Sequence, residues 1–236
     1  MKIKKAFFDL DGTLLPLDPD GFVKEYFGGL CKKLAPRGYE PQKLVGSIWK
    51  GTAAMVANDG SRTNEQVFWD VFADIYGEEA KGDIEIFDEF YREDFCSIKA
   101  IDVCDPKAAE TVRALKARGV GIVVATNPIF PLTAQKTRLK KAGIDPSEVE
   151  YITSYENSHY CKPNPEYYSE IMRVLGCKAE ECVMIGNDVG EDMIAGKLGF
   201  DVFLLTNCMI NAADADITKY DRGGFDELRV WLDGKI

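Results

Sequence analysis

Residues 7–14 read Phe7-Phe8-Asp9-Leu10-Asp11-Gly12-Thr13-Leu14. Residues 3–8 have the length and the apolar side chains of a buried β-strand. Two carboxylates, those of Asp9 and Asp11, leave the end of this strand, and Gly12 then allows the chain to turn sharply. An Asp-Gly pair is also common in simple turns that close a strand, so this stretch alone leaves a catalytic and a purely structural interpretation open.

Short apolar runs rich in β-branched and aromatic residues recur along the chain. They are apolar on both faces, as in the strands of a parallel sheet that helices cover. The runs are residues 3–8, 120–125, 151–153, 183–185 and 202–205. Helical patterns follow them over residues 106–118, 132–141, 165–175, 191–198 and 225–232. This alternation predicts an α/β fold with a doubly wound, Rossmann-like parallel sheet.

Residues 16–98 interrupt the alternation of strands and helices. They contain four helical patterns, at residues 22–34, 42–56, 64–76 and 84–95, and no obvious core strand. Turn residues at 58–61 and at Gly77 separate the last three. We therefore expect a smaller, all-helical cap domain over residues 16–98 and a core domain built from residues 1–15 and 99–236.

Composition and charge exclude several kinds of partner. The chain has 236 residues, with 29 basic against 39 acidic side chains and a net charge of -10. Such a balance disfavours binding to nucleic acid and to acidic membrane surfaces. No apolar stretch reaches the length of a membrane span, and Asp9 ends the first apolar run too early for a signal peptide.

Cysteine and histidine usage limits the chemistry further. Seven cysteines, an odd number without a Cys-X-X-Cys pair, indicate reduced thiols in a cytoplasmic protein. A single histidine, His159, rules out a multi-histidine metal site within one chain, and a Ser-His-Asp system would have to use it. We expect His159 to be an ordinary loop residue.

Polar side chains also follow the second strand and precede a later helix. Thr126 and Asn127 come directly after residues 120–125. Both are good helix N-caps, and this interpretation is compatible with phosphate binding, because the free amides of a helix N-terminus bind anions. Lys162, between Cys161 and Pro163, can act as a point charge for a phosphoryl oxygen, although a solvated side chain is the ordinary alternative.

The fourth polar group follows residues 183–185 and reads Gly186-Asn187-Asp188-Val189-Gly190-Glu191-Asp192. Acidic residues at this place can simply favour the dipole of a following helix. They also provide the oxygen ligands that Mg²⁺ prefers, usually one or two carboxylates together with water and substrate phosphate.

The four groups, in this order and each next to a strand end, resemble the haloacid dehalogenase superfamily of hydrolases. The resemblance covers residues 1–15 and roughly 100–205, and residues 16–98 match the family's α-helical cap, inserted after the first motif. It implies that Asp9 is the nucleophile and a metal ligand. It implies that Asp11 is the general acid and base and offers its backbone carbonyl to the metal.

The same resemblance assigns the remaining site residues. Thr126 and Lys162 would hold the phosphoryl group, with Asn127 beside it. Asp188 would ligate Mg²⁺, and Asp192 would support the metal site. The chain departs from the common family pattern in having Asn187 before Asp188, which leaves the division of metal binding among Asp188, Glu191 and Asp192 open.

These residues predict a magnesium-dependent phosphohydrolase that cleaves a small phosphate monoester through an aspartyl-phosphate intermediate. A dehalogenase typically lacks the second aspartate, and Asp11 also counts against phosphonate hydrolysis, for which Lys50 is the one tempting cap lysine. Two alternatives to a phosphohydrolase remain: a sugar phosphomutase and a non-catalytic binding protein on this scaffold. The predicted substrate is a small phosphorylated metabolite. Arg62, which follows the turn at residues 58–61, is the predicted contact between the cap and this substrate. The alternative is that the Arg62 side chain is simply solvated.

Overall fold

The computed structural model describes residues 3–236 and contains one six-stranded sheet. The strands lie in the order β3-β2-β1-β4-β5-β6, and every neighbouring pair is parallel. Their bounds are β1 Lys5–Phe8, β2 Gly121–Val124, β3 Tyr151–Ile152, β4 Cys182–Gly186, β5 Asp201–Leu205 and β6 Asp221–Gly223. The five predicted strands are confirmed with small shifts at their ends. The sixth, β6, was not predicted, because its Asp-Arg-Gly sequence at the sheet edge carries no apolar run.

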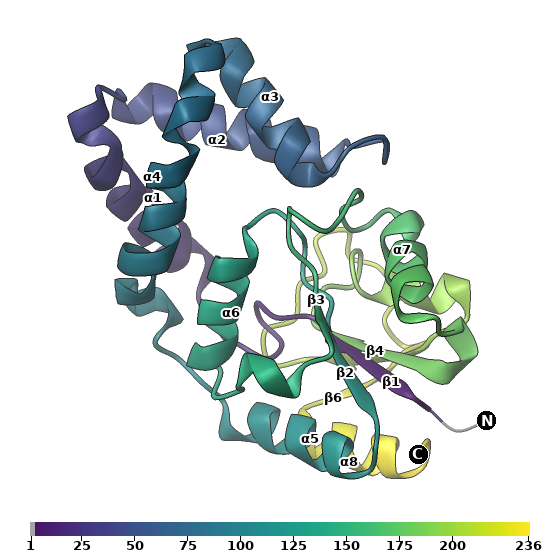
Figure 1. Cartoon of the computed structure of the whole chain (residues 1–236). Helices are drawn as coiled ribbons and strands as arrows, with labels where there is room; N and C mark the ends of the chain where they lie inside the picture. Colours follow the sequence, from purple (N-terminus) through teal and green to yellow (C-terminus); the bar gives the residue numbers. More distant parts are fainter. Residues whose placement is uncertain (1–2) are drawn as a thin grey trace.

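Helices cover both faces of the sheet (Figure 1). Side chains alternate along β1, so that Ala6 and Phe8 belong to the larger hydrophobic core and Phe7 to a second one. Helices α5 (Pro106–Ala117), α6 (Leu132–Lys141) and α8 (Phe225–Asp233) contribute to the larger core. Helix α7 (Pro165–Leu175) and the 3₁₀ segment Met193–Leu198 contribute to the second. The predicted doubly wound α/β sheet is thereby confirmed.

Two predicted helices differ in type from those in the structure. Residues 191–198 form a turn followed by the 3₁₀ segment Met193–Leu198. Residues 84–95 begin as α4 (Ile84–Glu89), continue as a π-helical turn, Phe90–Asp94, and end in a 3₁₀ turn, Phe95–Ser97. The spacing of apolar residues does not distinguish these hydrogen-bonding patterns over so few residues.

Three of the helices that lie between β1 and β2 begin at clear capping signals. The α1 helix (Pro19–Leu34) starts with proline after Asp18, whose side chain accepts hydrogen bonds from two backbone amides of the first turn. Helix α2 (Pro41–Val56) starts in the same way after Glu40. Helix α3 (Asn64–Tyr76) has a capping box formed by Thr63 and Gln66. Within residues 16–98, all of which the structure describes, no β-strand occurs.

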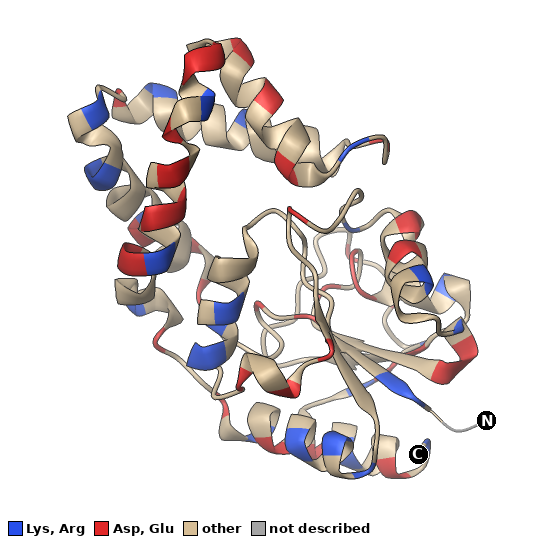
Figure 2. Cartoon of the chain, in the orientation of Figure 1, with Lys and Arg blue, Asp and Glu red and all other residues tan. Residues whose placement is uncertain are grey.

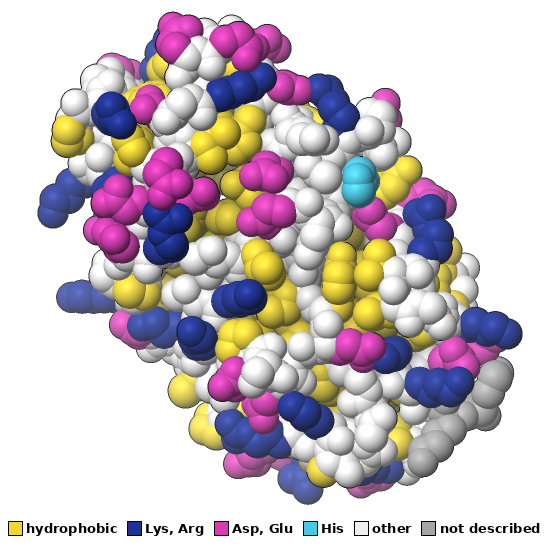
Figure 3. Space-filling model, viewed as in Figure 1, with side chains coloured by type: hydrophobic (Ala, Val, Ile, Leu, Met, Phe, Trp, Pro, Cys, Tyr) yellow, Lys and Arg dark blue, Asp and Glu magenta, His cyan; other side chains and the backbone are white. Residues whose placement is uncertain are grey.

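Aromatic side chains form the interior of this helical block. The Phe72 ring lies 5.3 Å from Trp69, 4.8 Å from Tyr76 and 5.5 Å from Phe87, measured between ring centroids. Figure 1 shows the block on the side of the sheet where the strands end. On the face shown in Figure 3, hydrophobic side chains also gather where the block meets the rest of the molecule.

Two features bear on the expectations from composition. No helix within residues 3–236 is long and apolar enough to cross a membrane. All seven cysteines are free, in agreement with the expected thiols.

Replacing Phe72 by alanine tests the aromatic interior of the helical block. Phe72 is fully buried, so Phe72→Ala should lower the free energy of unfolding by about 3–5 kcal/mol, because it removes contacts and leaves a cavity. Urea unfolding followed by circular dichroism measures the loss. Val230→Ala on α8, where Val230 is 74% exposed, is the control and should change the value by less than about 0.5 kcal/mol. Equal effects in the two variants would contradict this packing.

Candidate active site

The pairing of the strands brings the predicted motifs to one edge of the sheet. Strand β1 lies between β2 and β4, with Phe8 opposite Val124 on one side and Ile185 on the other. The Asp9 amide continues the ladder by donating to the Ile185 carbonyl at 2.9 Å. Chain order reverses at β1, and in open parallel sheets such a reversal opens a crevice at the carboxyl ends of the strands.

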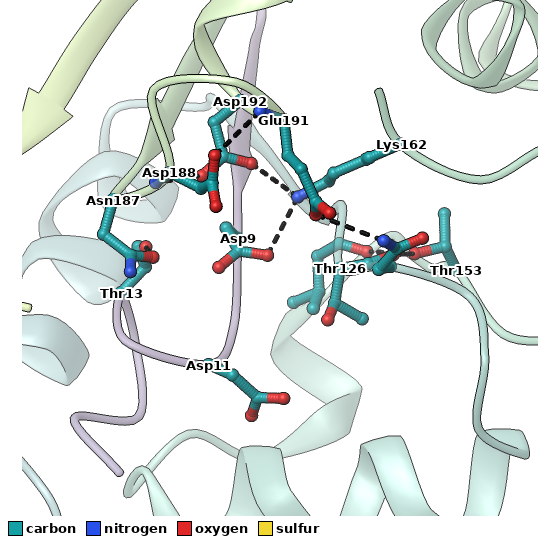
Figure 4. A network of polar contacts seen from close by, with 12 residues as sticks. Asp9, Asp11, Thr13, Thr126, Thr153, Lys162, Asn187, Asp188, Glu191 and Asp192 are labelled. Atoms are coloured by element: carbon teal, nitrogen blue, oxygen red, sulfur yellow. Dashed lines mark hydrogen bonds and ion pairs between the residues drawn. The ribbon is translucent and has the colours of Figure 1, made fainter. Parts of the chain in front are cut away.

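A buried lysine joins two carboxylates in this crevice (Figure 4). The Lys162 Nζ atom lies 2.9 Å from Asp9 Oδ1 and 2.6 Å from Asp192 Oδ1, and its side chain is 1% exposed. Burial disfavours the charge on Lys162, but the carboxylates of Asp192 and Asp9 outweigh this effect and hold its pKa well above the usual value. Lys162 is therefore a fixed cation directly beside Asp9.

Asp192 and Asp188 have different surroundings. Asp192 is buried, and its second oxygen, Oδ2, accepts a hydrogen bond from the Asp188 amide at 2.9 Å. Asp188 Oδ1 accepts from the amides of Gly190 and Glu191, at 2.7 and 2.9 Å. In Figure 4 the Asp188 carboxylate lies near that of Asp9, and the Asp192 carboxylate lies above Asp9 beside the Lys162 nitrogen. Asp192 thus orients the lysine and the Asp188 turn, and Asp188 is the residue available to a ligand.

The polar groups after β2 contact the same centre. Thr126 is 3% exposed, and its carbonyl accepts hydrogen bonds from the hydroxyls of Thr153 (2.7 Å) and Tyr167 (2.9 Å). The Asn127 side-chain amide donates to Glu191 Oε2 at 3.1 Å. Burial raises the pKa of Glu191 to about 7, with Lys162 opposing this shift. Residues after β2 and β4 are in this way tied together around Asp9.

Asn187, the residue that departs from the family pattern, connects the first motif to the fourth. Its Oδ1 accepts from the Thr13 hydroxyl at 2.8 Å, and its Nδ2 donates to the Cys208 carbonyl at 2.7 Å. Gly12 lies against it with φ +83°, and a Cβ atom there would be 2.3 Å from Asn187 Nδ2. The turn after Asp11 therefore requires glycine both for its backbone angle and for space.

Arg138 is a site residue that the motifs did not reveal. It lies on α6, is 1% exposed, and forms an ion pair with Asp11 Oδ2. Partial burial of the Asp11 side chain, which is 36% exposed, raises the pKa of its carboxyl group; Arg138 opposes this shift and Asp9 adds to it. The sequence signal was present but weak: Arg138 follows the buried Ala134 by four residues and so shares its helix face.

Two residues singled out from the sequence have partners of their own. Arg62 is 53% exposed and pairs with Asp70 on α3. The neighbouring Asn64 contacts the loop after β3, since its backbone N–H donates to the Ser158 carbonyl at 2.9 Å. The role of Arg62 in substrate binding stays a prediction. His159 Nδ1 lies 2.6 Å from Glu170 Oε1, outside the network around Lys162.

The donor set around Asp9 fits Mg²⁺. Asp9 Oδ2 has no hydrogen-bond partner within residues 3–236, and Asp188 lies beside it with the backbone of Asp11 close in the chain. No cluster of three or more His, Cys, Asp or Glu side chains suited to a metal occurs in those residues. Two carboxylates and one carbonyl suffice for Mg²⁺, which usually keeps several water ligands.

Comparisons with known proteins identify the class to which this fold and site belong. The model of the haloacid dehalogenase-like hydrolases matches residues 3–199. The chain therefore belongs to the haloacid dehalogenase-like hydrolases, which confirms the predicted superfamily and the predicted enzyme class.

Individual relatives agree with this assignment. The chain is 26% identical over 230 residues to a glyceraldehyde 3-phosphate phosphatase of Methanothermobacter thermautotrophicus, covering 95% of this chain and 93% of that protein. Over 88 residues it is 36% identical to the pyrophosphatase PpaX of Halalkalibacterium halodurans, covering 37% of this chain and 39% of that protein.

Solved structures share the fold at low identity. A 2-haloacid dehalogenase from Pseudomonas syringae pv. Tomato has a TM-score of 0.62 at 21% identity, covering 98% of this chain and 99% of that one. The HAD hydrolase YfnB from Bacillus subtilis, described as bound to magnesium with interdomain movement, has a TM-score of 0.58 at 20% identity, covering 99% and 100%.

Two glycines with the same backbone angle test the turn after Asp11. Gly12 and Gly38 both have φ +83°, but a Cβ on Gly38 would meet no atom within 4 Å. Gly38→Ala should lower the free energy of unfolding by about 1–2 kcal/mol, the penalty of the left-handed conformation. Gly12→Ala should lose about 1–3 kcal/mol more, because its methyl group displaces the bonded Asn187. Urea unfolding compares the two, and equal losses would refute the close contact.

Proposed function

We propose that the chain is a magnesium-dependent phosphatase that cleaves a small phosphate monoester through an aspartyl-phosphate on Asp9. The observation that carries the proposal is the buried Lys162, whose ammonium group lies 2.9 Å from Asp9 Oδ1. A fixed cation beside a nucleophilic carboxylate lowers the repulsion that an approaching phosphate dianion meets. The family assignment and the two curated phosphatase relatives support the same chemistry.

The first chemical step transfers the phosphoryl group to the enzyme. An Asp9 oxygen forms a bond to phosphorus while the ester P–O bond breaks. Asp11 gives its proton to the departing alcohol oxygen, as a general acid. Lys162, Thr126 and Asn127 hold the oxygens of the phosphoryl group.

The second step returns the enzyme to its starting state. Asp11, now a carboxylate, takes a proton from water, whose oxygen attacks the phosphorus and releases Asp9. Asp9, the Asp11 carbonyl and Asp188 would hold Mg²⁺, with Asp192 supporting them, and the bound ion would neutralise part of the phosphate charge. Burial raises the pKa of Asp11 above its usual value, which favours the protonated form that a general acid needs.

Asp11 separates this proposal from dehalogenation, although dehalogenases share the fold. A halide leaves without a proton, so dehalogenation does not need a general acid such as Asp11. A sugar phosphomutase keeps both aspartates and remains the second candidate. Transfer of phosphate to another hydroxyl of the substrate, in place of release into solution, would favour it.

Residues 16–98 are proposed to act as a cap over the site. The helices of the block pack aromatic side chains around Phe72, and the block is joined to the sheet at its two ends. Closure of such a block on a bound substrate would exclude water. Figure 2 shows acidic and basic residues intermixed along the helices, which supports a small metabolite as the partner in place of nucleic acid. The free cysteines support a cytoplasmic location.

Asp9→Asn tests the proposed nucleophile. The variant keeps the side-chain volume, and phosphate release from a panel of phosphorylated metabolites should fall by about 10³-fold or more. Chelation of divalent metal from the unaltered enzyme should also stop release, and added Mg²⁺ should restore it. Asp201→Asn is the control, because Asp201 lies at the amino end of β5, away from the carboxyl ends of the strands where the site lies, and pairs with Lys235. An unaltered enzyme that releases no phosphate from any compound of the panel would overturn the proposal.

Arg62→Ala tests the proposed cap contact. If Arg62 leaves Asp70 to bind an anionic group of the substrate, kcat/KM on the best substrate should fall by about 5- to 150-fold, as for a charge-assisted hydrogen bond. Arg92→Ala is a matched control, since Arg92 is a cap arginine with similar exposure, 48%, and is paired with Glu85. If the two variants behave alike, Arg62 has no part in substrate binding.

A further inference from the structure

Arg138 is a buried cation that the proposed chemistry does not use. Its side chain is 1% exposed, and its guanidinium group donates through Nη1 to Asp11 Oδ2 and through Nη2 to Gln135 Oε1, the latter at 2.5 Å. Gln135 is fully buried one helical turn earlier on α6. The only carboxylate that pairs with Arg138 within residues 3–236 is that of Asp11.

We propose that Arg138 is a positioning residue that fixes the carboxylate of Asp11 for proton transfer to the leaving group. The proposal rests on the function assigned above to Asp11. It assigns no contact between Arg138 and the substrate: the arginine acts through the aspartate alone.

The surroundings of Arg138 hold its guanidinium plane in place. It lies 4.6 Å from the ring centroid of Phe130 and 5.7 Å from that of Phe22. Phe130 follows β2, whereas Phe22 belongs to α1 of the helical block. A planar cation stacked by aromatic rings from two parts of the molecule has little freedom to turn, so it can impose a direction on the carboxylate that it binds.

The hydrogen bonds leave one oxygen of Asp11 available. Arg138 occupies Oδ2, whereas Oδ1 is shielded from solvent and has no hydrogen-bond partner within residues 3–236. A general acid needs one oxygen that carries the proton and faces the leaving group, with the other held by the protein. In Figure 4 the Asp11 side chain lies apart from the Lys162 cluster, so its direction is not set by that lysine.

A purely structural role explains the arginine less well. Burying a charged side chain such as that of Arg138 costs desolvation energy that its attraction to a partner often fails to recover, and an apolar side chain of similar size can be equally stabilising. The Nε atom of Arg138 and Nε2 of Gln135 also remain buried without partners among the described residues. With these hydrogen bonds missing, Arg138 and Gln135 contribute little to the stability of the fold, but Arg138 still orients the Asp11 carboxylate.

Two aryl phosphates of similar shape distinguish positioning from stability. Phenolate is a poorer leaving group than 4-nitrophenolate, so phenyl phosphate depends more strongly on protonation by a placed acid. We define the ratio as kcat/KM for phenyl phosphate divided by kcat/KM for 4-nitrophenyl phosphate, with Mg²⁺ present. Both values come from one preparation, so partial unfolding of a variant cancels from the ratio.

Arg138→Met should lower this ratio about tenfold or more, because a misplaced acid penalises the poorer leaving group. Arg138→Lys keeps the charge but loses the planar, two-pronged donor, so it should restore the ratio only partly. If the methionine variant does not fold, the lysine variant takes its place as the test. Arg118→Met is the matched control: Arg118 pairs with Asp233 at 2.6 Å on the surface and should leave the ratio unchanged.

A double-mutant cycle with Asp11→Asn shows whether the arginine acts through Asp11. Asp11→Asn alone should lower the ratio, and adding Arg138→Met should then change it by less than about twofold. An unchanged ratio in both Arg138 variants, or an equal fall with and without Asp11, would overturn the positioning role. An unaltered enzyme that hydrolyses neither compound would instead overturn the proposed function, and this inference with it.

Discussion

The ammonium group of Lys162 holds the centre of the molecule together. Three carboxylates, those of Asp9, Asp188 and Asp192, lie at one sheet edge, and such a concentration of negative charge inside a protein is unstable without a cation. Lys162 bridges Asp9 and Asp192, and Asp192 in turn bonds the Asp188 backbone. Because the bridge joins the ends of β1 and β4 to the loop before α7, the site and the packing of the sheet depend on the same charge.

Local signals in the sequence predict most of this architecture. Apolar runs mark five strands because strands covered on both faces exclude polar side chains. Helix α3 has the bounds expected from its pattern and from the turns before and after it. The motif residues could be grouped for a related reason: in a parallel sheet, side chains that follow adjacent strands must meet. Asp9 and Asp192 illustrate this, because they follow the neighbouring strands β1 and β4 and both contact Lys162.

Features that depend on tertiary contacts could not be predicted in the same way. Strand β6 is polar and forms because β5 offers it a free edge. Arg138 resembles any helical arginine in the sequence, and only the tertiary contacts with Asp11, Phe22 and Phe130 distinguish it as a buried cation of the site. The partner of Asn187 was equally hidden, because Thr13 lies 174 residues away in the chain.

The order of the strands also has a consequence during synthesis of the chain. Strand β1, which ends at Phe8, leaves the ribosome before the other five strands, and β4 begins only at Cys182. At roughly 5–20 residues per second, synthesis of the chain from Phe8 to β4 takes on the order of 10 to 40 s. During this time Phe7 and Phe8 do not yet have β4 as a neighbouring strand. Until Arg138 and Lys162 have been made, Asp9 and Asp11 lack the cations that pair with them in the folded chain. Charged residues beside an apolar run disfavour aggregation, so the two aspartates of the first motif also favour a nascent strand that stays hydrated.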